Sequence, residues 1–478
     1  MRYYWTRFSF NYPKVIIYML QGSDYRTKEY IKWLHRSYDY RKVMKRRKLD
    51  YTLKARLLLT IAWFILLAIY TLTIILMVQS IIGSDILMVA LAIILFVISP
   101  LIIAYGIIIP LRIGKKVLQE PRQRKIINNA RQIISNHSAL KIAVVGSYGK
   151  TTAKEILNTI LSKGKKVAFT SGNMNTLLGI SRFAQTLDGS EEIIVFELGE
   201  EQVGDIRDLC ELTQPDIGII TGINEAHLSS FGTLDRTIAT VFEIKDYLGK
   251  KTLYKNLESP LVAAKVSDDD RLVFNRHGAN GWQVSDAATD INGTTFVAKK
   301  GGKTLFAHSG LLGLQNIGII TVAIDIADSV GLTIPQIVEG IRATVPFEHR
   351  MQPRHLHGAW LIDDTYNGNS EGVQAGLLFL KDLDAKRRIY ITPGLVEQGS
   401  KTREVHEKIG RQIAKVADVV VLMQNSATDY IADGLHSGKF DGKLLVVDNP
   451  LEFYTNLDHF VAKGDVVLMQ NDWTDNFA

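Results

Sequence analysis

The sequence predicts an α/β protein in which a P-loop parallel-sheet domain and a C-terminal, Rossmann-like α/β domain follow a two-helix transmembrane hairpin. Short apolar runs alternate with helix-length segments from residue 139 onward, which is typical of parallel sheets with crossover helices. A glycine turn separates the first of these runs from a helical stretch, and two long uncharged runs lie before residue 112. The predicted divisions are a basic aromatic segment at 1–56, the hairpin at 57–111, a linker at 112–138, and α/β domains at 139–345 and 346–478.

Residues 1–56 are rich in basic and aromatic side chains. Residues 1–125 contain 21 Lys and Arg against 6 Asp and Glu, so the net charge of +7 conceals a mildly acidic remainder. A basic, aromatic segment is typical of nucleic-acid surfaces, but the apolar runs that follow favour contact with anionic lipid headgroups. A solvated charged tail is an equally good interpretation. We therefore expect membrane lipids, and no nucleic acid, as partners.

Two uncharged runs, residues 57–84 and 86–111, each exceed the roughly 20 residues that span a bilayer. The short break between them predicts a transmembrane helical hairpin. Lys and Arg crowd both outer flanks and are missing from the connector. The positive-inside rule then places both termini and the catalytic domains on the cytoplasmic side of the cell membrane. A single cysteine, Cys210, suits this reducing compartment, and residues 112–138 are predicted to form a polar, helical linker.

A strand, a glycine turn and a helix at the start of the first α/β domain predict a phosphate site. Residues 142–145 predict a buried strand, and a helical stretch begins at Lys150. Free backbone N–H groups at this helix start would bind the phosphates of ATP. Lys150 would reach the β and γ phosphates, and the Thr151 hydroxyl would bind Mg²⁺. The usual first glycine is replaced by Val144, and an ordinary strand–turn–helix connection is the alternative. The predicted nucleotide-binding residues of this loop are Gly146, Ser147, Tyr148, Gly149, Lys150, Thr151 and Thr152.

Polar residues follow three further apolar runs of this domain. Asn173, Glu197 and His227 lie at or after the carboxyl ends of predicted strands, where ligands bind in parallel sheets. A carboxylate and an imidazole beside phosphates are reasonable ligands of a second metal ion, so the predicted metal ligands are Thr151, Glu197 and His227. Each also has a structural explanation, as a turn residue, a helix cap or a buried polar group. The predicted strands lie at 167–170, 193–197 and 217–221 here and at 389–392, 419–423, 444–447 and 466–469 in the second domain, which has a predicted helix at 402–415.

Seven sequence blocks, in order, resemble the Mur ligase family, most closely its D-alanyl-D-alanine-adding (MurF-type) branch, over about residues 140–478. The resemblance implies an ATP-dependent ligase of cell-wall (peptidoglycan) precursor synthesis. In such an enzyme ATP phosphorylates a substrate carboxylate, and an amine attacks the acyl phosphate. By position, Asn316 would contact adenine, Arg350 the nucleotide phosphates and Asp364 the ribose, with Lys150, Glu197, His227 and Arg350 as catalytic residues. The blocks are VVGSYGKTT, GNMNTLLG, FELGEEQVGDI, PDIGIITGINEAHLSSFG, GLQN, PFEHRMQPR and LIDDTYNGNS.

The chain departs from the family pattern in four places. The adenine block has Gln315 where the family usually has His and Ile319 where it usually has a second Asn. Val241 stands where the family has a carbamylated lysine that holds the second metal, and Glu243 or Lys245 are the candidates to replace it. The family's basic loop near the C-terminus is replaced by residues 470–474, QNDWT. The hairpin stands in place of the family's first domain, which reads a sugar nucleotide. We expect a peptide-bearing carboxylate, free or lipid-linked, and an amino acid or dipeptide amine as substrates. A poly-γ-glutamate-type synthase and a non-catalytic nucleotide-binding membrane scaffold are the alternatives.

Overall fold

The computed structural model describes residues 4–36, 40, 49–172, 174–224, 231–267, 272–366, 368–395, 398, 401–425 and 427–471. The chain forms two compact units, residues 1–125 and 126–478. The boundary between them lies inside the predicted linker.

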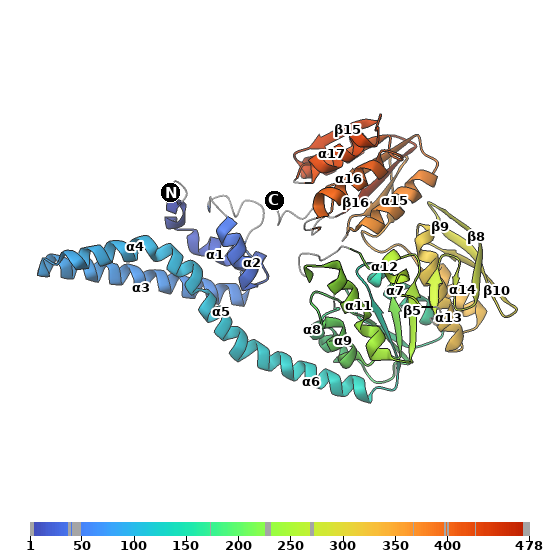
Figure 1. Ribbon diagram of the computed structural model, residues 1–478, viewed down its shortest axis with the longest axis horizontal. Coiled ribbons are helices and arrows are strands. Elements are labelled where there is room, and N and C mark those ends of the chain that lie inside the picture. Colours follow the sequence, from blue (N-terminus) through green and yellow to red (C-terminus); the bar gives the residue numbers. More distant parts are fainter. Residues whose placement is uncertain are drawn as a thin grey trace. The chain divides into compact units, whose positions relative to one another are not determined.

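Two long apolar helices, α3 (Leu53–Gly83) and α4 (Ile86–Gly106), lie side by side as a hairpin in the first unit (Figure 1). Both are long and apolar enough to cross a membrane by length and composition. The Thr52 side chain caps α3, and the Asp85 side chain caps α4. The uncharged run continues to residue 111, but α4 already ends at Gly106. Pro110 interrupts the helix, because proline has no N–H to bond to the Gly106 carbonyl. The predicted pair of helices is therefore confirmed, but the second helix is shorter than predicted.

The N-terminal segment folds into helices, so its interpretation as a solvated charged tail is wrong for the residues that are described. A short 3₁₀-helix, η1 (Tyr4–Phe8), precedes α1 (Tyr12–Gly22) and α2 (Thr27–Arg36). Buried side chains of α1 and α2 share one apolar core with α3 and α4. The Tyr30 hydroxyl donates to the Ala104 carbonyl at 2.7 Å. The many charged residues of this segment made the apolar face of α1 hard to recognise in the sequence.

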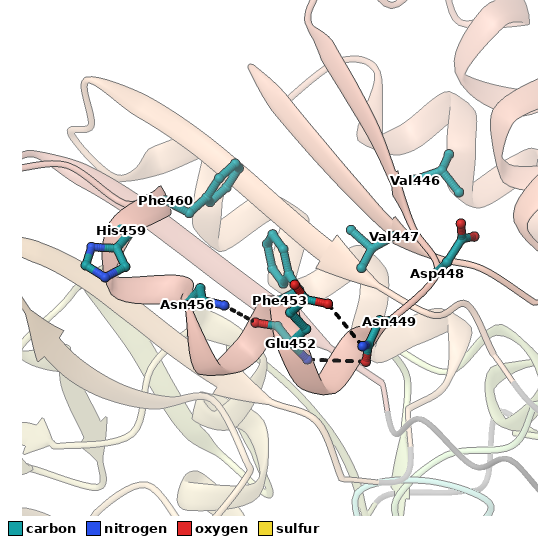
Figure 2. A pocket seen from close by; sticks show the side chains of 9 residues that line it. All are labelled: Val446, Val447, Asp448, Asn449, Glu452, Phe453, Asn456, His459 and Phe460. Atoms are coloured by element: carbon teal, nitrogen blue, oxygen red, sulfur yellow. Dashed lines mark hydrogen bonds between the residues drawn. The ribbon is translucent and has the colours of Figure 1, made fainter.

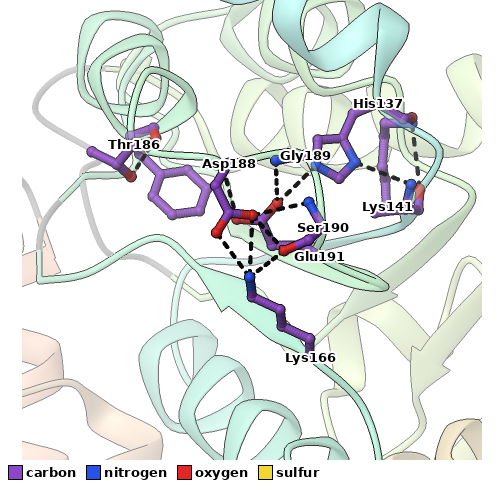
Figure 3. A network of polar contacts seen from close by, with 10 residues as sticks. His137, Lys141, Lys166, Thr186, Asp188, Gly189, Ser190 and Glu191 are labelled. Atoms are coloured by element: carbon purple, nitrogen blue, oxygen red, sulfur yellow. Dashed lines mark hydrogen bonds and ion pairs between the residues drawn. The ribbon is translucent and has the colours of Figure 1, made fainter.

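The predicted linker is helical, as expected. It consists of α5 (Ile108–Gly114), the π-helical turn η2 (Lys115–Gln119) and α6 (Glu120–Asn136). Within the second unit, a polar network joins the residues after α6 to Glu191 (Figure 3). His137 Nδ1 accepts from Ala139 N at 3.1 Å, so its Nε2–H donates to Glu191 at 2.9 Å. The Lys141 ammonium donates to the His137 carbonyl at 2.7 Å.

The second unit begins with an α/β domain that is built on a ten-stranded sheet, with the order β10-β9-β8-β7-β6-β5-β4-β1-β3-β2. Its parallel part confirms the predicted strands, and helices pack on both faces. The parallel strands are β1 (Leu140–Val145), β2 (Val167–Phe169), β3 (Ile193–Glu197), β4 (Ile217–Ile220), β5 (Thr252–Asn256) and β6 (Val273–Asn275). The helices are α7 (Lys150–Leu161), α13 (Ile317–Ser329) and α14 (Ile334–Arg342) on one face, and α6, α8 (Leu177–Ala184), α9 (Asp205–Thr213) and α11 (Leu234–Leu248) on the other, with the short α12 (Pro260–Ala263) after β5.

Four antiparallel strands extend this sheet and were not predicted from the sequence. Their threonine, lysine and alanine residues give no continuous apolar run. Gly293 is required at the tight turn between two of them, because a Cβ there would lie 2.1 Å from the Ser309 carbonyl oxygen. These strands are β7 (Gly278–Ala279), β8 (Trp282–Asp290), β9 (Gly293–Lys300) and β10 (Lys303–Ser309), followed by the 3₁₀ turn η3 (Leu314–Asn316).

The C-terminal α/β domain is a six-stranded sheet with the order β11-β12-β16-β13-β14-β15. Helices α15, α16 and α17 pack on one face, and α18 and α19 on the other. A groove of about 600 Å³ lies between the end of β15 and these last two helices and contains none of the predicted site residues (Figure 2). The elements are β11 (Gln352–Leu356), β12 (Ala359–Asp364), α15 (Ser370–Asp382), β13 (Arg387–Thr392), α16 (Thr402–Ile413), β14 (Val419–Met423), α17 (Thr428–Ser437), β15 (Lys443–Val447), α18 (Pro450–Thr455), α19 (Leu457–Phe460) and β16 (Asp465–Gln470).

Candidate active site

The loop between β1 and α7 has the backbone geometry of a phosphate-binding turn. Gly146 and Gly149 have φ values of 139° and 77°, which L side chains rarely adopt. A Cβ at Gly146 would also lie 2.5 Å from the Thr221 hydroxyl oxygen. Gly149 is the N-cap of α7 and offers no side-chain cap. The first N–H groups of α7 are therefore available to an anion, as the sequence predicted.

The Lys150 ammonium lies within this loop. It donates to the Gly146 carbonyl and, at 2.9 Å, to Glu200 Oε2. Both side chains are largely buried, with 12% and 1% of their area exposed. A phosphate group that enters the loop therefore competes with the Glu200 carboxylate for this ammonium. Glu200 was not among the predicted residues, because only the fold brings the turn after β3 against the start of α7.

Glu197 lies at the end of β3, where it was predicted. Its backbone N–H donates to the Thr170 hydroxyl, and its Oε1 accepts from Asn175 at 3.2 Å. Its Oε2 has no hydrogen-bond partner and lies 3.4 Å from the ammonium of Lys154. Lys154 is completely buried, one helical turn after Lys150. Sequence reasoning missed Lys154, although a lysine four residues after the loop lysine shares its face of α7.

Oxygen atoms at this edge of the sheet fit a magnesium ion. Ser147 Oγ and Glu197 Oε2 are buried and have no hydrogen-bond partner in the described structure, and Thr151 lies in the first turn of α7. Hydroxyl and carboxylate oxygens are ligands that Mg²⁺ prefers, usually together with substrate phosphates. No group of three or more His, Cys, Asp or Glu occurs among the described residues in a metal-binding arrangement. The predicted residues Asn173 and His227 lie outside the described residues.

The remaining loop residues support the turn. Tyr148 packs over Gly222, where a Cβ would lie 2.2 Å from its ring, and burial raises the pKa of Tyr148 to about 12. The Ser147 N–H donates to the Gly222 carbonyl at 2.7 Å. Thr152 follows Thr151 in the first turn of α7 and is partly buried.

The suggestion that Glu243 binds metal in place of the family's carbamylated lysine is wrong. Its carboxylate accepts from the backbone N–H groups of Gly204 and Arg207, each at 2.9 Å, and thereby caps the start of α9. A capping carboxylate with these bonds is already committed to a helix start. Val241 is completely buried in an apolar core, and Lys245 is exposed on α11.

Residues after the first domain supply a second set of polar groups. The Arg350 guanidinium lies 4.9 Å from the centre of the Tyr366 ring, and burial lowers its pKa. Asp364 accepts from Gln470 Nε2 at 2.7 Å and from Met351 N at 3.2 Å. Burial raises the pKa of Asp364 to about 6, against the opposing effects of the Gln470 hydrogen bond and of Arg350.

Asn316 lies where η3 meets α13. Its Nδ2 donates to the Leu312 carbonyl at 2.9 Å and to the Gly313 carbonyl at 3.3 Å. These bonds use the amide protons within its own turn and leave the side-chain oxygen to accept from a ligand. Its contact with adenine stays a prediction.

Comparisons with known proteins match both α/β domains. Residues 144–327 match the Mur ligase middle domain, and residues 349–470 match the domain described as "Mur ligase, glutamate ligase domain". The chain belongs to the Mur ligase family. This Mur ligase is 30% identical over 288 residues to the UDP-N-acetylmuramoyl-tripeptide–D-alanyl-D-alanine ligase of Borreliella burgdorferi, with 58% of this chain and 60% of that protein covered. It is 28% identical over 329 residues to the ligase of the same name from Haemophilus influenzae, with 64% and 68% covered.

Solved structures agree with this family. The MurF ligase of Thermotoga maritima in complex with ADP is 26% identical, with a TM-score of 0.64 and with 73% of this chain and 80% of that chain covered. MurF of Acinetobacter baumannii gives a TM-score of 0.65 at 22% identity, with 73% and 77% covered, and supports the fold alone. This Mur ligase thus matches the MurF type in its two α/β domains.

Proposed function

We propose that this Mur ligase is a membrane-anchored, ATP-dependent amide ligase of cell-wall precursor synthesis. It joins the carboxylate of a peptide-bearing precursor to the amine of an amino acid or dipeptide. The relatives are named for a UDP-N-acetylmuramoyl-tripeptide and D-alanyl-D-alanine. The observation that carries the proposal is the loop after β1, in which Lys150 and the free start of α7 form a phosphate site beside the carboxylate of Glu197.

The proposed reaction proceeds in two steps. A substrate carboxylate oxygen attacks the γ phosphorus of ATP, and ADP leaves. The amine nitrogen then attacks the acyl carbon, loses a proton, and expels phosphate. In phosphoryl transfer the protein mainly positions the reacting groups and supplies positive charge. Thr151 and Glu197 would hold Mg²⁺, which would supply part of that charge.

The residues of this chain have separate tasks in the proposed reaction. The N–H groups at the start of α7 orient the phosphates, and Lys150 leaves Glu200 to offset the charge that develops on the transferred group. Arg350, a partly buried cation, would contact the nucleotide phosphates in this proposal. Asp364 would contact the ribose, since a carboxyl can accept hydrogen bonds from hydroxyl groups.

The anchor of this proposed enzyme is the hairpin of α3 and α4, with the α/β domains in the cytoplasm. Support comes from the length and apolar surface of both helices and from the basic flanks. A membrane-held site meets a lipid-linked acceptor at high local concentration. We therefore include a lipid-linked form of the peptide substrate in the proposal.

The test combines the full chain in vesicles with ATP, Mg²⁺, D-alanyl-D-alanine and either a lipid-linked or a nucleotide-linked muramoyl tripeptide. The expected result is phosphate release with an amide product of the predicted mass. A variant that begins at Gln119 is the matched control and should keep nucleotide binding but lose most turnover of the lipid-linked acceptor. ATP binding without any amide product would favour the scaffold alternative, and a polymeric glutamate product would favour the synthase alternative. Equal turnover by both forms would contradict a lipid-linked substrate.

A further inference from the structure

A cavity of about 360 Å³ lies in the first unit, between the N-terminal segment and the helical hairpin. Apolar side chains of η1, α3 and α4 form much of its wall, including Phe8, Trp63 and Pro100. Two of its lining residues, Phe10 and Leu67, are 78% and 62% exposed. The cavity therefore opens onto the apolar outer surface of the proposed membrane hairpin.

Three polar groups line this cavity and lack partners. The Tyr12 hydroxyl, the Ser99 hydroxyl and the Arg7 Nε–H are buried and make no hydrogen bond in the described structure. The exposed fractions of the Tyr12 and Ser99 residues are 1% and 0%. Buried polar groups are normally paired, so three unpaired donors around one cavity indicate a ligand with acceptor atoms.

The charge of the cavity points to an anion. The Arg7 guanidinium lies over the rings of Tyr4 and Tyr40, at 5.2 Å and 5.0 Å from their centres. No carboxylate occurs among the described lining residues, and none of the described carboxylates forms an ion pair with Arg7. Two aromatic faces hold the cation in place, and its Nε–H is left without a partner and can donate to an acceptor. A phosphate oxygen suits this fork together with two hydroxyl donors.

The surroundings distinguish a lipid phosphate from a soluble one. Trp5, next to the cavity residues, is 65% exposed, and its ring stacks near Phe8 with 5.5 Å between centres. An exposed Trp side chain beside long apolar helices is typical of the membrane interface. A soluble anion would gain nothing from the apolar wall, whereas a lipid would lay its chains along it.

We infer that this cavity is a binding site for one anionic phospholipid, whose phosphate accepts from Arg7, Tyr12 and Ser99 while its chains lie against α3 and α4. The site belongs to the first unit, so its existence does not depend on the ligase activity. It would anchor the N-terminal helices to the hairpin in an anionic bilayer.

The test uses the purified full chain in non-ionic detergent, with added phosphatidylglycerol or phosphatidylcholine, and reads lipid retention by native mass spectrometry and stability by thermal melting. Wild type should retain one phosphatidylglycerol with about tenfold preference over phosphatidylcholine, because both lipids carry the phosphate but the choline group brings a second cation beside Arg7. The double variant Tyr12→Phe/Ser99→Ala removes two donors to the phosphate and should lose most of the retained phosphatidylglycerol. Without added lipid it should melt at the same temperature as wild type or higher, because the deleted hydroxyls have no partner there.

Two controls complete the design. Tyr30→Phe removes a buried hydroxyl that is already bonded to Ala104 and that does not line the cavity. This variant should keep the lipid preference while melting at a lower temperature. Inorganic phosphate should not displace phosphatidylglycerol from wild type in the mass spectra. Equal retention of both lipids by wild type, unchanged retention in the double variant, or displacement of the lipid by inorganic phosphate would each overturn the inference.

Discussion

Replacement of Asp364 by asparagine should stabilise the second unit at neutral pH. Burial raises the pKa of this carboxyl from 3.8 to about 6, so the folded state holds a proton that the unfolded state has lost. Because the folded pKa is the higher one, stability falls as pH rises through the window from 3.8 to about 6. At pH 7 the folded protein bears the full cost of an ionised, buried carboxylate. Asp364→Asn removes that cost.

The magnitude follows from the two pKa values. The ionisation cost is about 2.9 kcal/mol at pH 7 and about 1.6 kcal/mol at pH 5, since one pKa unit corresponds to about 1.36 kcal/mol. The asparagine oxygen can accept from only one of Gln470 and Met351, so one hydrogen bond worth about 1 kcal/mol is lost at both pH values. The variant should therefore exceed wild type by about 2 kcal/mol at pH 7. This advantage should shrink by about 1.3 kcal/mol at pH 5.

The assay is denaturant unfolding of the full chain in non-ionic detergent, followed by the fluorescence of tryptophans such as Trp360, which lies on the same strand as Asp364. Asp363→Asn is the matched control, because the neighbouring carboxylate pairs with His349 at 2.8 Å. That change should lower stability at pH 7. If Asp364→Asn destabilises the protein at pH 7, or if its advantage does not depend on pH, the assignment of a raised pKa is refuted.

Four further predictions concern the loop and its surroundings. Lys150→Ala should abolish ATP-dependent phosphate release, since no other described ammonium lies in the loop; near-normal turnover would contradict its role. Glu200→Gln should tighten nucleotide binding several-fold in a fluorescent-ATP titration, because it frees Lys150; weaker binding would show that the carboxylate itself contacts the ligand. With Val241 buried in the apolar core, removal of dissolved CO₂ should leave the rate unchanged, and a reversible drop would reveal a carbamylated lysine elsewhere. Lys154→Met should destabilise the protein by about 3–5 kcal/mol in denaturant unfolding, and Lys154→Met combined with Glu197→Gln should recover part of that loss.

The sequence predicted best those strands that are buried on both faces. The bounds of β3 and β14 match the predicted runs at 193–197 and 419–423, because apolar residues fill β14 and all of β3 except its last position, as is typical of strands between two helical layers. The start of α7 was equally clear, since a glycine turn and a buried apolar run bracket it. The strands β7 to β10 escaped prediction because one face of that part of the sheet is exposed, so these strands contain no continuous apolar run.

Pairings between distant side chains were the least predictable part of the site. The contact of Glu200 with Lys150 joins residues fifty positions apart. Nothing in the sequence around either residue predicts it. The error over Glu243 has the same origin. Its spacing within α11 suggested a metal ligand, but the start of α9 lies against it and uses its carboxylate as a cap. When a side chain of one helix caps another helix, the contact depends on tertiary packing. The spacing of residues along one helix cannot predict such a contact.

The surroundings of Glu197 explain how a site without a lysine at position 241 keeps its charges balanced. A carboxylate buried at the end of β3 needs a counter-charge, because an unpaired buried ion is costly. The ammonium of Lys154, 3.4 Å away and completely buried, supplies one from within the protein. The same ammonium lies 3.5 Å from Glu155 Oε1, so it is shared between two carboxylates. The counter-charge for Glu197 is therefore built into α7, and this pairing does not depend on a lysine at position 241.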